Sequence, residues 1–154
     1  MLSQATHRLR AITHGLYPVA IDAAGLFGSI QSLTNGMRTL TGCEISLDCG
    51  GPEPVLDEET LLHIYRIVQE ATANAIKHSQ GSAIDISLLC DRANLRLTIS
   101  DNGRGIVRSN RRRVRQGIGM ATMKARASAI GAKLSVTSPR SGGVRVRLQL
   151  PLKA

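Results

Sequence analysis

The sequence predicts an α+β fold, a two-layer sandwich in which a mixed, mostly antiparallel sheet carries helices on one face. Three observations lead to this prediction. Long stretches have apolar residues at intervals of three and four, which is typical of amphipathic helices. Shorter stretches alternate between apolar and polar residues, which is typical of strands with one buried face. The 154 residues are enough for one domain with a real hydrophobic core.

Two helices are predicted in the first part of the chain. Residues 1–17 carry partial apolar stripes, and Pro18 ends that helix. The second helix stops at Gly42 and has a clear apolar stripe, made of Leu26, Ile30, Leu33, Met37 and Leu40. A short strand over residues 43–48 and the turn-rich connection CGGPEPV follow.

A third predicted helix contains the segment EATANAIKHS. Asp57 or Glu58 can cap its start, and Glu58 and Glu59 suit the positive end of the helix dipole. Its inward face is an apolar stripe, made of Leu61, Ile64, Val68, Ala71 and Ala75. The helix is therefore expected to pack against the sheet.

The same helix carries a polar set beside this stripe. Glu70, Asn74 and Lys77 are spaced by four and three residues, so they share a neighbouring face, with His78 alongside. The set lies along an edge of the buried face, which is where a ligand pocket above a core would place it.

Two hairpins and a fourth helix complete the predicted fold. Residues 83–90 and 95–100 form one hairpin through the turn DRAN, and KLSVTS pairs with GGVRVRLQLP in the other. Between them, GIGMATMKARASAIG predicts a helix that begins at its glycines and ends at Gly131. The inward residues of this helix are Met120, Met123, Ala127 and Ile130. The last strand alternates, with Val144, Val146, Leu148 and Leu150 on one face and Arg145, Arg147 and Gln149 on the other.

Composition argues against several classes of protein. The net charge is +9, but six arginines fall in one short segment, whereas a nucleic-acid footprint would spread along a face or groove. One Phe, two Tyr and no Trp argue against base stacking. No apolar stretch reaches the ~18 residues of a membrane span, and no secretory signal is present. Three cysteines without CxxC spacing predict reduced, buried or half-buried thiols in a cytoplasmic protein.

The segment DNGRGI has two readings. It places Asp101 at a strand end, before Gly103 and Gly105. A carboxylate there can accept a hydrogen bond from an exocyclic amine such as N6 of adenine, a bond that contributes about 1.5–3 kcal/mol. The glycines would let a flat ligand approach the backbone. The alternative is a plain Asx-Gly turn leading out of the strand.

Two further segments also have a functional and a structural reading. Gly117 and Gly119, at the predicted helix start, could offer backbone N–H groups to phosphate, although GxG alone is common. The carboxylate of Glu70 and the amide oxygen of Asn74 suit Mg²⁺, which keeps several waters and binds beside substrate phosphates. The alternative for that face is a polar stripe on an exposed helix edge.

In this order and spacing, EATANAIKH, DNGRGI and GIGMATMKAR resemble the N, G1 and G2 boxes of the GHKL ATPases. The narrower resemblance is to the ATP-binding catalytic (HATPase) domains of nitrate-sensor-type two-component sensor histidine kinases. LRAITHGLYPVAIDAAGL is similar to the end of their second dimerisation helix. The resemblance implies the GHKL (Bergerat) fold, with residues 1–18 as the end of that helix and a linker, and residues 19–154 as the catalytic domain.

The resemblance also implies roles by position. In the helix motif, Asn74 would ligate Mg²⁺, Glu70 would hold a coordinated water, and both would count as catalytic. The other positions would bind the nucleotide: Lys77 and His78 its phosphates, Asp101, Gly103 and Gly105 its adenine, and Gly117 and Gly119 the β- and γ-phosphates. The arginine segment would lie in the lid over ATP, where Arg113 or Arg115 could touch the γ-phosphate or simply be solvated.

The implied function is to present the γ-phosphate of Mg-ATP to a histidine on a dimerisation domain absent from this chain. The phosphoryl group would pass on to a response regulator, and the full-length protein would be a homodimer. The phosphoacceptor context, L-H-D followed by Gln, is missing around His7, His14, His63 and His78, so autophosphorylation is not expected from this chain alone. The alternative is a non-catalytic GHKL regulatory module that acts by protein docking. An intact set of boxes argues against this alternative. A basic DNA-binding protein is a third reading.

Overall fold

The structure, a computed structural model, describes residues 21–78, 83–104 and 110–153. In chain order its elements are α2 (Ile21–Thr41), β1 (Glu44–Gly50), α3 (Glu58–His78), β2 (Ala83–Cys90), β3 (Asn94–Asp101), α4 (Asn110–Ala129), β4 (Lys133–Thr137) and β5 (Arg145–Pro151). The helix predicted over residues 1–17 lies outside these ranges.

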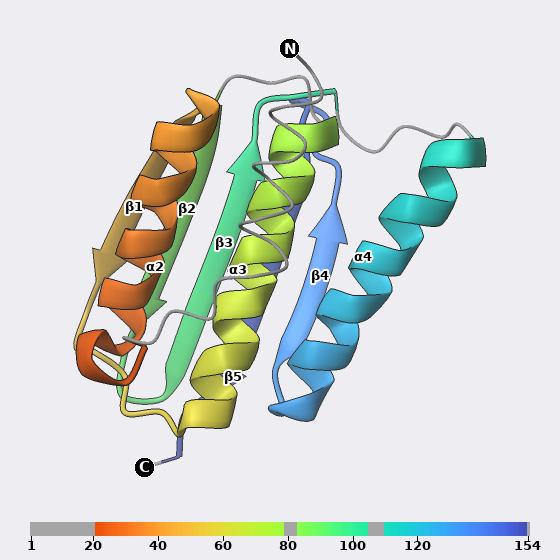
Figure 1. The fold of residues 1–154 in the computed structure, drawn as a ribbon. Helices are drawn as coiled ribbons and strands as arrows, with labels where there is room; N and C mark the ends of the chain where they lie inside the picture. The colour runs from red at the N-terminus through yellow and green to blue at the C-terminus, as the bar shows by residue number, and fades with distance from the viewer. Residues whose placement is uncertain (1–20, 79–82, 105–109, 154) are drawn as a thin grey trace.

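The strands form one sheet in the order β1-β2-β3-β5-β4. β1 and β2 are parallel and the other neighbours are antiparallel, as the prediction of a mixed, mostly antiparallel sheet requires. The three helices lie on one face of this sheet (Figure 1). The predicted α+β two-layer sandwich is therefore confirmed.

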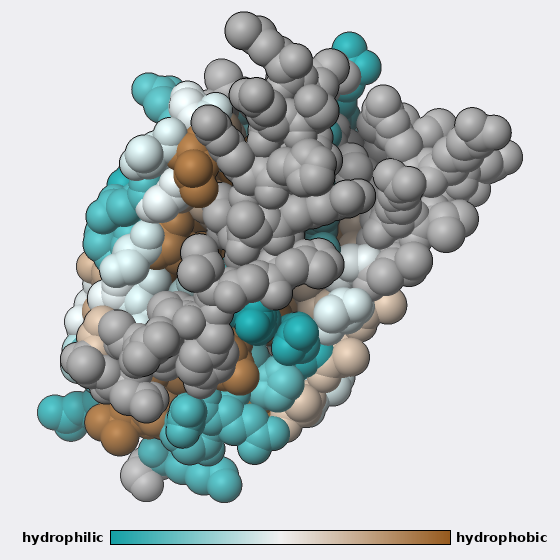
Figure 2. All heavy atoms as spheres, viewed as in Figure 1, coloured by the Kyte–Doolittle hydropathy of each residue, from teal (hydrophilic) through white to brown (hydrophobic). Residues whose placement is uncertain are grey.

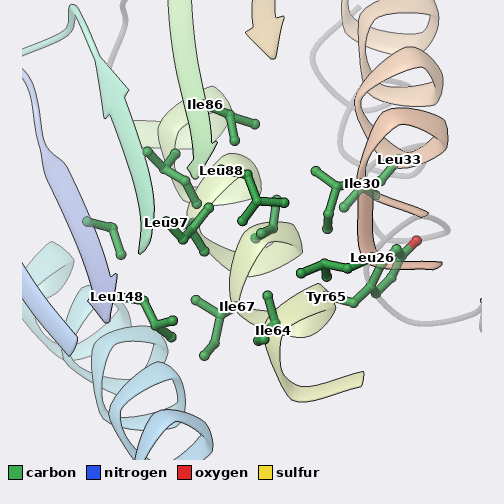
Figure 3. Close-up of a cluster of buried hydrophobic side chains, with 14 of the residues drawn as sticks. Leu26, Ile30, Leu33, Ile64, Tyr65, Ile67, Ile86, Leu88, Leu97 and Leu148 are labelled. Carbon is green, nitrogen blue, oxygen red and sulfur yellow. The ribbon is translucent and has the colours of Figure 1, made fainter. Parts of the chain in front are cut away.

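The core lies between the helices and the sheet. Figure 3 shows side chains from α2, α3, β2, β3 and β5 meeting there, among them Ile64, Leu88 and Leu97, each at most 1% exposed. All five residues of the stripe predicted on α3 are buried: Leu61, Ile64, Val68, Ala71 and Ala75. Burial of the Leu, Ile and Val side chains contributes about 1.5–3 kcal/mol each, so these stripes hold the two layers together.

The helix α2 is interrupted near its start. Gly25 has φ 65° and ψ −172°, so the regular helix runs from Leu26 onward. The Glu53 carboxylate, from the β1–α3 connection, accepts hydrogen bonds from the backbone N–H groups of Leu26 and of Phe27, the latter at 3.2 Å from Oε1. A side chain 27 positions away thus caps this helix. Of the predicted stripe, Leu26, Ile30, Leu33 and Met37 are buried, whereas Leu40 is exposed.

The start of α3 matches its prediction. Asp57 Oδ1 accepts a hydrogen bond from the Thr60 backbone N–H at 2.7 Å, which is the geometry of an N-cap. Glu58 and Glu59 follow in the first turn. Figure 2 shows hydrophilic residues gathered at this end of the helix-bearing face.

The start predicted for α4 is wrong. The helix begins at Asn110, about two turns before Gly117. Its first turns contain RRRVRQ, and Arg and Gln are good helix formers, so the helix extends upstream of the glycines. Met123 and Ala127 are buried as predicted, and Met120 and Ile130 are half-buried. Gly117 and Gly119 are therefore interior residues of this helix, and their N–H groups are not those of a free helix N-terminus.

The three cysteines are free thiols. Cys90 is buried and Cys43 half-buried, as predicted, but Cys49 is exposed because it stands near the end of the edge strand β1. Burial is the main cause that raises the pKa of all three thiols. Among the helices of the described ranges, none is long and apolar enough to cross a membrane.

Candidate functional site

The polar face of α3 lies near its C-terminal end. Glu70 and Asn74 are half-buried and Lys77 is exposed, while their neighbours Ala71 and Ala75 are buried in the core. This end of α3 lies beside the end of β3 that carries Asp101 (Figure 1). Glu70, Asn74 and Lys77 therefore lie along the edge of the buried stripe, as the sequence predicts, whereas the side chain of His78 lies outside the described residues.

The glycine motif of α4 meets this polar face. A Cβ added at Gly119 would lie 2.7 Å from Glu70 Oε1 and 3.1 Å from Asn74 Nδ2. Gly119 is buried, so α4 approaches α3 at a point where there is no space for a side chain. The contact brings a carboxylate, a carboxamide and a glycine backbone to one place, although Gly119 is 45 or more positions away from both side chains in the sequence.

The DNG segment forms a tight turn at the end of β3. The Gly103 backbone N–H donates to Asp101 Oδ1 at 2.8 Å, and the Asn102 side chain accepts from the Ala83 N–H at 3.1 Å. The turn is thus an Asx turn anchored on the first residue of β2. Within the described ranges, Oδ2 of Asp101 has no hydrogen-bond partner, which leaves one carboxylate oxygen for a ligand amine. The structural and the functional readings of this segment are compatible.

Gly143, in the β4–β5 connection, was not selected by sequence reasoning. It has φ 77°, and a Cβ there would overlap the backbone carbonyl oxygen of Asp101 and lie 3.1 Å from its Oδ1. Its N–H donates to the Gly103 carbonyl at 2.8 Å, and the Asp101 N–H donates to the Val144 carbonyl at 3.1 Å. The double glycine before the last strand was the available signal, because a simple hairpin does not need two.

Other predicted site residues are described less fully. His78 ends α3, but its side chain is outside the described part, as are Gly105 and the surroundings of Gly117. Arg104 is exposed. The structure does not describe the side chains of the other arginines in this segment, namely Arg108, Arg111, Arg112, Arg113 and Arg115. The structure therefore brings together Glu70, Asn74 and Gly119, and separately Asp101 and Gly103.

The donor set suits Mg²⁺ better than a metal held by protein ligands alone. The described residues contain no group of three or more His, Cys, Asp or Glu side chains that could hold a metal ion. Mg²⁺ is usually bound through one or two protein oxygens, several waters and substrate phosphates. The Glu70 carboxylate and the Asn74 carboxamide, which both lie against Gly119, are consistent with that chemistry.

Two hollows in the described part lie away from these residues. One, of about 540 Å³, is at the opposite end, between the start of α3, the β2–β3 turn and the end of β5. The other, of about 420 Å³, is on the face of the sheet that carries no helix. Neither is lined by Glu70, Asn74 or Asp101.

Known proteins provide an independent comparison. Residues 59–154 match the family model described as histidine kinase-, DNA gyrase B-, and HSP90-like ATPase. The sensor histidine kinase LiaS from Bacillus subtilis is 29% identical over 152 residues, which cover 99% of this chain and 41% of that protein. The sensor protein NarQ homolog from Haemophilus influenzae is 30% identical over 136 residues, 88% of this chain and 24% of that protein.

The fold has known counterparts as well. The histidine kinase domain of a blue-light activated histidine kinase from Erythrobacter litoralis superposes with a TM-score of 0.66 at 22% identity, covering 98% of this chain and 79% of that one. The resemblance drawn from the three motifs is confirmed by these matches. The chain spans less than half the length of the two sensor proteins.

Proposed function

Because this chain belongs to the histidine kinase-, DNA gyrase B-, and HSP90-like ATPase family, we propose that it is the ATP-binding catalytic domain of a sensor histidine kinase. The observation that carries the proposal is the contact of Gly119 with Glu70 and Asn74 at the end of the fold that also holds Asp101. Family membership implies ATP binding, and these residues supply an acceptor for the base and oxygens for a metal beside the phosphates.

We assign the adenine end of the site to the turn after β3. Oδ1 of Asp101 is held by the Gly103 N–H, which fixes the carboxylate plane and leaves Oδ2 to accept from an exocyclic amine. Gly143 holds this turn from the other side. As the family motif implies, Gly103 and Gly105 would shape the wall against the ring. Adenine carries such an amine and guanine does not carry it at the same position, so the carboxylate selects ATP.

We assign the metal and phosphate end to α3 and α4. Asn74 ligates Mg²⁺ and Glu70 holds a coordinated water, since an amide and a carboxylate oxygen are hard ligands. Lys77 and His78 at the end of α3 reach phosphate oxygens, and Gly117 and Gly119 give the backbone room beside the β- and γ-phosphates. When bound, Mg²⁺ neutralises charge on the phosphates during transfer.

In this proposal residues 1–18 are the end of a dimerisation helix and a linker, and residues 19–154 are the catalytic domain. The γ-phosphoryl group goes to a histidine on the dimerisation domain of the parent kinase, itself a homodimer, and then to a response regulator. Phosphoryl transfer depends mainly on positioning and electrostatics, so the work of this domain is to hold ATP and present its end. The ATP pool that it uses is that of the cytoplasm.

Nucleotide titration of the 154-residue chain tests the assignment of Asp101. Isothermal titration calorimetry with ATP should show at least about tenfold weaker binding for Asp101→Asn, because the amide replaces a charged acceptor. Asp85→Asn removes a carboxylate from the opposite face of the sheet and serves as the control. Equal ATP affinity for Asp101→Asn and the unmodified chain would remove Asp101 from the site.

Titration with and without Mg²⁺ tests the metal site separately. Asn74→Ala should abolish the dependence of ATP affinity on Mg²⁺ and leave the affinity for metal-free ATP within about twofold. A retained Mg²⁺ dependence would reject Asn74 as the ligand. The docking-module alternative is tested by adding a dimerisation domain as a separate protein, because only a catalytic domain would phosphorylate it.

A further inference from the structure

The face of the sheet without helices carries an ordered grid of polar side chains. Strand register places the residues of β1, β2, β3, β5 and β4 in cross-strand rows. One row reads Ser46, Asp85, Ser100, Arg145 and Thr137, and the next reads Asp48, Ser87, Thr98, Arg147 and Ser135. A third row reads Gly50, Leu89, Arg96, Gln149 and Lys133. The register therefore fixes which charges are neighbours.

Charges of opposite sign are separated on this face. The β1–β2 half carries three carboxylates and no cation, namely Glu44, Asp48 and Asp85. The β3–β5–β4 half carries four cations, namely Arg96, Lys133, Arg145 and Arg147, and no carboxylate on the open face. Each half is therefore a patch of single sign, with short hydroxyl side chains between the two.

The cations are largely uncompensated within the described residues. Arg96 pairs with Asp91 of the β2–β3 turn at 2.6 Å. Arg147, Lys133 and Arg145 have no described carboxylate within 4.0 Å, although Arg145 donates to Ser100 Oγ at 3.2 Å. The hollow of about 420 Å³ lies among Arg96, Arg147 and Lys133. This half of the face is thus open to an acidic surface.

We propose that this open sheet face is an interface between two copies of the chain, with the acidic half of each copy on the basic half of the other. A two-fold axis parallel to the strands and above β3 exchanges the two halves. In the first row, Asp85 of one copy then faces Arg145 of the second copy, and the reverse contact forms by symmetry. Arg96 lies near the axis, where its pairing with Asp91 reduces repulsion.

The size of the face sets the strength of this contact. Five strands at a spacing of about 4.8 Å and a length of about 20 Å would bury about 1,000 Å² over both copies. That area is at the lower limit for a specific interface, and its charged groups lose solvation, so the dimer is weak and depends on salt. The contact does not depend on the proposed kinase function.

Sedimentation of the 154-residue chain tests the interface directly. In about 25 mM NaCl, the weight-average mass should rise above 16.5 kDa between about 10 and 500 μM protein, and in about 500 mM NaCl it should not. Reversing the basic half with Arg145→Glu and Arg147→Glu should weaken self-association at least about tenfold. Reversing the acidic half with Asp48→Lys and Asp85→Lys should have the same effect.

Mixing the two reversed proteins provides the decisive measurement. In one protein the former basic half has no net charge, because Arg96 and Lys133 offset the two new glutamates, and in the other protein both halves are basic. The mixture pairs each new glutamate half with a new lysine half and each unmodified acidic half with an unmodified basic half, so it should associate at low salt although neither protein does alone. Association of the mixture also shows that both variants are folded. If either charge-reversal variant fails to fold, the neutralising substitutions Arg147→Gln and Asp85→Asn test the same two halves with a smaller change. Lys124→Glu with Lys153→Glu makes the same charge change as the basic-half reversal, outside the open face, and should leave association unchanged.

Three results would overturn the proposal. The first is an unmodified chain that remains at 16.5 kDa at every low-salt concentration. The second is self-association that both reversals leave intact, or a mixture that stays monomeric. The third is a monomeric chain whose basic half binds a hexaglutamate peptide, which would assign this surface to a different acidic partner.

Discussion

Replacement of Gly143 by alanine tests whether the close contact of Gly143 with the backbone of Asp101, called the clamp below, holds the turn after β3. Gly143 has φ 77°, a conformation that costs an L-residue about 1–2 kcal/mol. The new Cβ would also overlap the Asp101 carbonyl oxygen, so either the turn after β3 or the β4–β5 connection must move. The two costs together should destabilise the chain by about 3 kcal/mol or more.

Gly131 provides a matched control. It has φ 72°, close to the value at Gly143, but a Cβ there would meet no atom within 4 Å. Gly131→Ala therefore has only the conformational cost, about 1 kcal/mol, which is a fall of roughly 3 °C in Tm for a domain of this size. The difference between the two variants isolates the steric contact with Asp101.

Two assays on the same proteins separate stability from binding. Urea denaturation should place Gly143→Ala about 2 kcal/mol below Gly131→Ala. ATP titration at a temperature where both are folded should show at least about tenfold weaker binding for Gly143→Ala only, because its Asp101 carboxylate is displaced. If the two variants had the same stability and ATP affinity, the clamp would have no role.

Two further predictions concern the helix caps. Glu53→Ala should lower the free energy of unfolding by about 1–2 kcal/mol in urea denaturation, because the N–H groups of Leu26 and Phe27 lose their acceptor. The control Glu44→Ala should change the free energy of unfolding by less than about 0.5 kcal/mol. Equal effects of the two substitutions would argue against the cap. Hydrogen bonds from Thr60 hold the pKa of Asp57 below its usual value, so this cap stabilises the fold above the unfolded-state pKa of about 4 and loses its effect as the pH falls through the lower folded-state pKa. Asp57→Asn should therefore show a shallower loss of stability below about pH 4, measured by thermal unfolding across pH, and an unchanged acid profile would contradict this reasoning.

Local patterns were enough to predict most elements. The strand β2 was predicted at its observed bounds, Ala83–Cys90, and β3 within one residue at each end. The stripe of α3 and its cap at Asp57 were also right, because apolar periodicity and capping act over a few residues. The prediction for the start of α4 is wrong because a glycine pair locally favours a helix boundary, whereas the preceding arginines favour helix.

The candidate site also has a part that the sequence predicts and a part that it does not. The polar set of α3 and the carboxylate at the end of β3 were visible as motifs, and so was the family to which they belong. The contacts of Gly119 with Glu70 and of Gly143 with Asp101 were not visible, because each joins residues more than 40 positions apart. No local periodicity reports which glycine will face which side chain.

The sequence by itself determined most of the local structure of this protein and the motifs that identify its family, and it supplied the candidate side chains for a nucleotide site. The tertiary structure alone decided where these groups meet. β3 lies between β2 and β5, and this order places the turn at Asp101 against Ala83 on one side and Gly143 on the other. The physical reason is that the strands pair to satisfy backbone hydrogen bonds and bury apolar faces over the whole chain, whereas sequence patterns record only near neighbours.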